Sequence, residues 1–158
     1  FNIVITGTNK GRLNNVLSKI KKNGVSCEGV IHDISSSNDV KKMVDISIRK
    51  FGRIDVLICN AGISIRSLFE DLDLNTFEKL FGINFLGTVY SVKHSLPHLI
   101  KTSGTIIAIS SLLYFVPMSG YCHLTGDGKK VNNFLGNDFS WKTKILRRKI
   151  VKIFAANK

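Results

Sequence analysis

Short apolar runs alternate with longer amphipathic segments along this chain, and this alternation constrains the fold more than any other feature. Extended runs are predicted at residues 2–6, 25–31, 54–59, 104–109 and 150–155. Between them, apolar residues recur at helical spacing, as Leu13, Leu17 and Ile20 do. Alternating strands and helices indicate a parallel sheet flanked by helices. The chain has 158 residues, so we predict one α/β domain over residues 1–158.

The helix boundaries follow from capping residues. Serines 35–37 followed by Asp39 predict the start of one helix, and Gly52 its end. A long helix is predicted over residues 75–101, with Pro97 either bending it or marking its last turns. A further helix is expected at residues 129–139.

Composition excludes several classes of protein. The formal net charge is +12, but no aromatic series or nucleic-acid motif accompanies it, so we expect no nucleic-acid partner. No apolar stretch is long enough to cross a bilayer. The cysteines (Cys27, Cys59 and Cys122) are widely spaced, which favours reduced thiols and a cytoplasmic location. The four histidines form no ligand pattern, so no metal site is predicted.

Small or polar residues follow the predicted strands at their carboxyl ends. The clusters are Thr6-Gly7, Asp33, Asn60-Ala61-Gly62 and Ser110-Ser111. In open α/β sheets, ligands bind at the carboxyl ends of the strands. The sequence therefore predicts a ligand site along one edge of the sheet.

Three longer motifs make this pattern specific. Residues 51–63 read Phe-Gly-Arg-Ile-Asp-Val-Leu-Ile-Cys-Asn-Ala-Gly-Ile, residues 81–87 read Phe-Gly-Ile-Asn-Phe-Leu-Gly, and residues 104–111 read Gly-Thr-Ile-Ile-Ala-Ile-Ser-Ser. Together with His32-Asp33-Ile34, they resemble the signatures of the short-chain dehydrogenase/reductase family. The resemblance covers residues 25–123 and implies a Rossmann-type fold that binds NAD or NADP.

The resemblance also implies roles for individual residues. It assigns Ser111 to orienting the substrate carbonyl, and Asn84 to a water-linked proton path. The residues expected to contact the cofactor are Thr6, Gly7, Asp33, Ile34, Asn60, Ala61 and Gly62. The substrate implied is a small alcohol or ketone, with hydride transfer to or from the nicotinamide.

The N-terminal part departs from the family pattern T-G-x-x-x-G-x-G. Gly11 matches one glycine, but Leu13 stands at the third glycine position. The stretch after Gly7 has room for one helix only, so the family's first helix and second strand are predicted to be missing. Lys10 and Arg12 slightly favour the 2′-phosphate of NADP.

The catalytic pair is the second departure. The family has a tyrosine about thirteen residues after the serine and a lysine four residues later, where this chain has Leu124 and Gly128. Tyr121 is the nearest tyrosine, but Lys129 lies more than two helical turns beyond it. Tyr114 is a weaker candidate, and both tyrosines also suit packing at a pocket edge.

The family's substrate-binding helices and final strand, which follow the strand predicted at 150–155, have no counterpart in this sequence. We therefore predict an oxidoreductase of this family that is shortened and catalytically impaired. The alternative is a non-catalytic remnant or interaction protein that keeps part of the fold. The shortened sheet leaves apolar edges, from which we predict poor solubility or a homo-oligomer.

Overall fold

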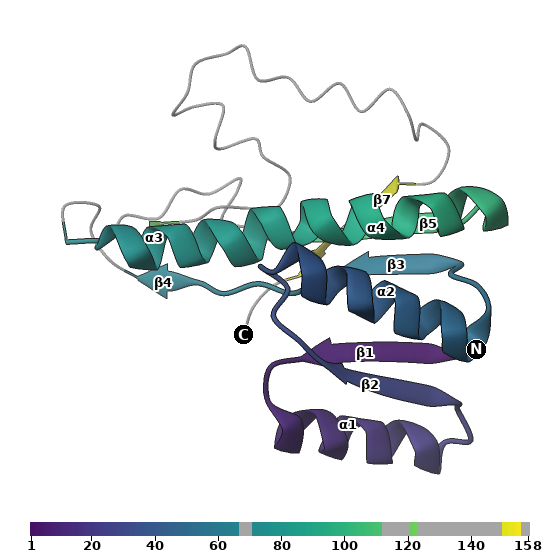
Figure 1. The fold of residues 1–158 in the computed structure, drawn as a ribbon. Coiled ribbons are helices and arrows are strands. Elements are labelled where there is room, and N and C mark those ends of the chain that lie inside the picture. The colour runs from purple at the N-terminus through teal and green to yellow at the C-terminus, as the bar shows by residue number, and fades with distance from the viewer. Residues whose placement is uncertain (67–70, 112–120, 123–149, 156–158) are drawn as a thin grey trace.

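The computed structural model describes residues 1–66, 71–111, 121–122 and 150–155, whose arrangement is shown in Figure 1. Helices flank parallel strands, which confirms the predicted α/β class. The expected strand at 150–155 is present as β7 (Ile150–Ala155). The helix expected at 129–139 lies outside the described residues.

The first strand–helix–strand unit forms where the sequence predicts it. β1 (Ile3–Gly7) leads into α1 (Lys10–Lys22), and β2 (Cys27–Ile31) follows. The side-chain oxygen of Asn9 accepts the backbone N–H of Arg12 at 2.9 Å, which satisfies one of the free donors at the start of α1. Gly24 turns the chain after the helix with a φ of 72°, a left-handed conformation that glycine adopts without steric cost.

Helix α2 (Ser37–Phe51) is bounded by the predicted signals. The hydroxyl of Ser36 accepts the backbone N–H of Asp39 at 3.3 Å, and Gly52 ends the helix with a φ of 75°. Val40 and Val44, one turn apart, are almost completely buried. This apolar face anchors α2 in the core.

The long helix predicted at 75–101 is present in three consecutive parts. They are α3 (Leu74–Phe81), the π-helical turn η1 (Gly82–Leu86) and α4 (Gly87–Thr102). Pro97 lies inside α4, and the helix continues beyond it to Thr102. β3 (Val56–Cys59) precedes this helix, and β5 (Thr105–Ser111) follows it.

The described strands form separate sheets. β1 pairs with β2, β3-β5-β7 form a three-stranded sheet, and both sheets are parallel. β4 (Ile65–Arg66) pairs antiparallel with β6 (Tyr121–Cys122). The sequence placed the missing strand between the strands that end at Gly7 and Ile31, but these pair directly, with those two residues opposite each other. The break in the sheet lies instead between β1 and β3.

The burial of β3 differs from the sequence prediction. The continuous apolar run at residues 54–59 predicts a strand covered on both faces, as central parallel strands are. Cys59 is buried, but Val56 and Ile58 are 51% and 59% exposed. Because alternate residues of a strand share a face, one face of β3 is open.

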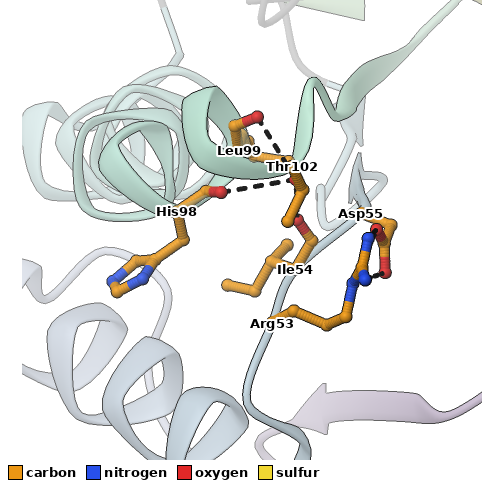
Figure 2. Close-up of polar contacts among 6 residues, drawn as sticks. All are labelled: Arg53, Ile54, Asp55, His98, Leu99 and Thr102. Carbon is orange, nitrogen blue, oxygen red and sulfur yellow. Dashed lines mark hydrogen bonds and ion pairs between the residues drawn. The ribbon is translucent and has the colours of Figure 1, made fainter.

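Polar contacts join the end of α4 to the segment that enters β3 (Figure 2). The hydroxyl of Thr102 lies 2.6 Å from the carbonyl oxygen of Ile54, and farther from the helix carbonyls of His98 and Leu99. Arg53 and Asp55 form a bidentate ion pair beside this contact. Since the ion pair is largely exposed, the part-buried Thr102 contact gives the more specific connection.

Two buried serines of α4 allow a matched test of the core. Ser95 is 1% exposed and its hydroxyl has no hydrogen-bond partner among the described residues, whereas the hydroxyl of Ser91 donates to the Gly87 carbonyl at 2.8 Å. Removing an unsatisfied buried hydroxyl from a helix is favourable. We expect Ser95→Ala to raise the free energy of unfolding by about 1 kcal/mol, measured by chemical denaturation. Ser91→Ala should change it by less; equal effects would contradict the assignment.

None of the helices in the described ranges is long and apolar enough to span a bilayer.

Candidate active site

Asn84 fixes the backbone of the Asn-Ala-Gly loop that leaves β3. Its side-chain oxygen accepts the N–H of Ile63 at 2.8 Å, and its side-chain nitrogen donates to the carbonyl of Ile63, also at 2.8 Å. The amide therefore pairs with both backbone groups of one residue, as a strand neighbour would. Asn84 is 9% exposed, so these bonds replace water at both backbone groups.

The π-helical turn around Asn84 sets the position of this side chain. Widened turns of this type occur mostly as single turns inside α-helices and are frequent at functional sites. The rings of Phe81 and Phe85 pack with centroids 4.9 Å apart at the same turn. A Cβ atom on Gly62 would lie 3.3 Å from the Asn84 oxygen, so a glycine permits the close approach of loop and helix.

Asp33 begins the loop that follows β2. Its carboxylate accepts the Ser35 hydroxyl at 2.7 Å and the Ser35 backbone N–H at 2.9 Å. These bonds, the hydroxyl first, hold the pKa of Asp33 below its ordinary value. The side chain is consequently ionised at neutral pH and available as a hydrogen-bond acceptor.

The loop after β2 packs on the same turn that carries Asn84. A Cβ atom on Gly87 would lie 3.0 Å from side-chain carbons of Ile34, and one on Gly82 would lie 3.3 Å from Ser35. The loops that follow β2 and β3 thus meet the helix at η1. The structure brings Asp33-Ile34 and the Asn60–Gly62 loop to one region around Asn84.

Cys59 precedes Asn60 at the end of β3. Burial raises the pKa of its thiol to about 11, so the thiol stays protonated at neutral pH. Cys59 therefore packs in the core as a neutral thiol. In the part of the chain that the structure describes, no group of three His, Cys, Asp or Glu side chains can hold a metal ion.

Thr6 and Gly7 end β1, opposite Val30 and Ile31 of β2. The Gly7 carbonyl accepts the backbone N–H of His32 at 3.3 Å, which connects the two strand ends. A Cβ atom on Gly7 would meet nothing within 4 Å. Gly7 is therefore not required by packing within the described residues.

Ser111 is the last residue of β5, aligned with Ala155 of β7. β5 pairs with β3 up to the position of Ala108, opposite Cys59, and then continues to Ser111. Tyr121 lies in β6, where its backbone pairs with that of Arg66. Leu124, Gly128 and Lys129 fall outside the described residues.

Sequence reasoning missed three features of this region. It did not anticipate the π-helical turn, the short β4–β6 pairing, or Ile63 as the backbone partner of Asn84. Three separate glycines, at positions 62, 82 and 87, were the available signal, since each permits a close approach to a neighbouring segment.

Parallel strands with helices between them, and loops gathered at their carboxyl ends, define an α/β domain of Rossmann type. A family model described as short chain dehydrogenase matches residues 1–125. The chain belongs to this family.

Curated relatives agree with this membership. The chain is 34% identical over 111 residues to 11-beta-hydroxysteroid dehydrogenase 1A of Arabidopsis thaliana, covering 69% of this chain and 32% of that protein. It is 39% identical over 94 residues to the human dehydrogenase/reductase SDR family member 7, covering 57% of this chain and 28% of that protein. The chain thus spans less than half the length of these relatives.

A solved structure shares the fold. The alcohol dehydrogenase of the archaeon Thermococcus sibiricus, complexed with 5-hydroxy-NADP, matches with a TM-score of 0.65 and 24% identity. The match covers 68% of this chain and 46% of that one.

Proposed function

We propose that this chain derives from an NAD(P)(H)-dependent oxidoreductase that interconverts an alcohol and a ketone, and that its catalytic activity is impaired. The observation that carries the proposal is the paired hydrogen bonding of Asn84 to Ile63. It shapes the loop from Asn60 to Gly62 at the carboxyl end of β3, where a dinucleotide binds in sheets of this type.

The remaining cofactor contacts are proposed from the arrangement of the strand ends. Asp33 is ionised and accepts hydrogen bonds, as an acceptor for the adenine ring would. Ile34 packs against Gly87 and gives the nucleotide region an apolar wall. Asn60, Ala61 and Gly62 border the same region, and Thr6 and Gly7 complete it at the end of β1.

Chemistry in this family needs a hydroxyl that orients the carbonyl and a group that passes a proton. We assign the first role to Ser111 at the end of β5 and a positioning role to Asn84. Leu124 and Gly128 stand where the family has its tyrosine and lysine, so Tyr121 is the proposed proton donor, with Tyr114 the weaker candidate. Positioned acid–base catalysis contributes roughly 10²- to 10⁴-fold, so we expect turnover reduced by about that factor.

Fluorescence titration with NADH and NADPH tests whether a nucleotide site persists. Binding of either nucleotide, together with ketone reduction that Ser111→Ala abolishes, supports an impaired enzyme. Binding without turnover supports the alternative, a non-catalytic remnant that keeps the nucleotide site. Absence of binding to both nucleotides contradicts the proposal.

We propose NADP as the preferred cofactor. The first turn of α1 contains Lys10 and Arg12 and no acidic residue. This turn follows β1, and both cations are exposed beside the free N–H groups at the start of the helix. A 2′-phosphate would gain both charge pairing and the favourable end of the helix dipole.

Charge reversal at this turn tests the preference. The double variant Lys10→Glu/Arg12→Glu is expected to weaken NADPH binding by about tenfold or more, because two attractive pairs become repulsive. NADH, which lacks the 2′-phosphate, should change by much less. Lys21→Glu, at the other end of α1, is the matched control and should leave both affinities nearly unchanged. Equal losses for both nucleotides would contradict the preference.

We propose a cytoplasmic location for this chain. The described cysteines, Cys27 and Cys59, are free and buried, which favours a reducing compartment such as the cytoplasm.

A further inference from the structure

Residues 33–36, which join β2 to α2, form a turn held together by local hydrogen bonds, here called the Asp33 turn. The Asp33 carboxylate accepts the hydroxyl of Ser35 at 2.7 Å and the backbone N–H of Ser35 at 2.9 Å. The backbone N–H of Ser36 donates to the Asp33 carbonyl at 3.1 Å, and the Ser36 hydroxyl caps α2. Both Ser35 bonds are exposed, so water competes for them and each adds little stability. The turn therefore depends on contacts with the rest of the molecule.

The Asp33 turn lies against the long helix formed by α3, η1 and α4. A Cβ atom on Gly87 would lie 3.0 Å from side-chain carbons of Ile34, and one on Gly82 would lie 3.3 Å from the Cβ of Ser35. Both are van der Waals contacts, which are short-ranged but have no preferred direction. They bring the turn close to the helix and leave its orientation to other contacts.

A directional contact is added one residue beyond the turn. The hydroxyl oxygen of Ser37, the first residue of α2, lies 3.0 Å from Nε2 of His94 on α4. This part-buried bond joins two helices that pack against each other and whose partners are 57 residues apart in the chain. A neutral imidazole accepts the hydroxyl hydrogen or donates its own, and a protonated one donates, so the bond is available in either charge state.

Ser37 is free to make this bond because it has no capping role. The N-cap of α2 is Ser36, whose hydroxyl accepts the backbone N–H of Asp39 at 3.3 Å. Helix ends fray unless they are held, and a bond at the first helical residue opposes fraying of the first turn. The Asp33 turn precedes that first turn directly, so what holds Ser37 also holds the residues before it.

We propose that His94 is a positioning residue for the nucleotide site: through its bond to Ser37 it holds the start of α2, and with it the carboxylate of Asp33, on the long helix. In this role His94 contacts no ligand and acts through Ser37 and the Asp33 turn. The effect on a nucleotide rests on the proposed function, in which Asp33 is an acceptor for the adenine ring. The link between His94 and the Asp33 turn does not.

The ionisation of Asp33 reports whether the turn is intact. The hydrogen bonds from Ser35, the hydroxyl first, hold the pKa of Asp33 below its ordinary value. Asp39 raises this pKa and His32 lowers it, and a substitution at position 94 removes neither group. When the turn loosens, the Ser35 bonds are made for less of the time, and the pKa of Asp33 moves up toward its ordinary value.

Two single variants and their combination test the link. His94→Leu and Ser37→Ala each remove the bond, and both leave the Ser36 cap in place. We expect each to raise the pKa of Asp33, followed by nuclear magnetic resonance of its carboxyl carbon, and to speed hydrogen exchange of the Ser35 amide about threefold to tenfold. The double variant should show no further change, because the same bond is lost. An unchanged Asp33 pKa and Ser35 exchange rate in His94→Leu would overturn the proposal.

Two further substitutions separate the hydrogen bond from packing and from charge. The amide of His94→Gln can donate and accept near the place of Nε2 without carrying a charge, so this variant should restore the low pKa of Asp33 and the slow exchange of Ser35. His98→Leu, one turn further along α4, makes the same change where no side-chain hydrogen bond is found among the described residues, and should alter neither measurement. If His94→Gln behaved like His94→Leu, the proposal would be overturned.

NADPH affinity, measured by fluorescence on the same variants, tests the consequence for a ligand. His94→Leu should weaken NADPH binding by about threefold to tenfold, and His94→Gln and His98→Leu should not. NADH should weaken by the same factor, since both nucleotides carry the adenine ring. A raised Asp33 pKa with unchanged affinity, or with no binding by the unaltered chain, would leave the link to His94 intact and count against the proposed function. Weaker binding by His94→Leu with Asp33 unchanged would overturn the positioning role and leave the proposed function standing.

Discussion

Asn84→Ala is expected to lower the free energy of unfolding by about 2–3 kcal/mol. The substitution removes both hydrogen bonds to Ile63 and leaves its N–H and carbonyl without these partners in a partly buried loop. Leaving such groups unpaired costs more than the net value of the bonds themselves. Chemical denaturation monitored by circular dichroism gives the measurement.

Two variants separate this effect from a general loss of side-chain contacts. Asn84→Asp retains an acceptor for the Ile63 N–H but places a second oxygen against the Ile63 carbonyl, so it should also destabilise. Asn75→Ala, at an exposed position of α3 on the same long helix, should change stability by less than about 0.5 kcal/mol. If Asn84→Ala lowered stability as little as Asn75→Ala, the two hydrogen bonds from Asn84 to Ile63 would not be what fixes the loop.

The loop at Asn60–Gly62 should also lose its shape in Asn84→Ala. Because the proposed nucleotide site includes this loop, any NADPH affinity of the chain is expected to fall with it. Nuclear magnetic resonance shifts of Ala61 and Gly62 would report the change directly.

Gly104→Ala is expected to destabilise the protein by about 2–3 kcal/mol, because an added methyl group has no space. Its Cβ would lie 2.7 Å from the carbonyl oxygen of Asp55 and 2.6 Å from a side-chain carbon of Leu99. The Asp55 carbonyl accepts the N–H of Thr105 at 2.8 Å, so the backbone cannot move away without losing the first bond between this segment and β5. Thr102 and Ile54, both drawn in Figure 2, form a neighbouring contact that would be strained as well.

Gly7→Ala is the matched control for this prediction. A Cβ there meets nothing within 4 Å, and the residue is not in the left-handed region, so stability should stay within about 0.5 kcal/mol. Comparable losses in both variants would show that close packing at Gly104 is not the cause. Gly7→Ala also tests the cofactor role of Gly7, since a ligand contact would appear as weaker NADPH binding at unchanged stability.

The sequence by itself determined most elements and the membership in a family. Hydrophobic spacing and the caps at Ser36 and Gly52 located α2, and the apolar runs located β1, β2, β3 and β5, because these signals are local. The Asn-Ala-Gly motif after an apolar run identified the region where loops gather. Counting residues from Ser111 placed Leu124 and Gly128 where the family has its tyrosine and lysine, and that assignment stays a prediction.

Only the tertiary structure decided which strands are neighbours. Residue spacing after Gly7 predicted a missing strand between the strands that end at Gly7 and Ile31, but these two strands pair directly, since pairing depends on edges that are distant in sequence. The apolar residues of β3 could not reveal that Val56 and Ile58 are exposed, because burial depends on which helices cover the face. In the same way, the sequence predicted a role for Asn84 but not its hydrogen-bond partner Ile63, which lies 21 residues away. Local propensities place elements along a chain; pairing and packing between distant segments place them in space.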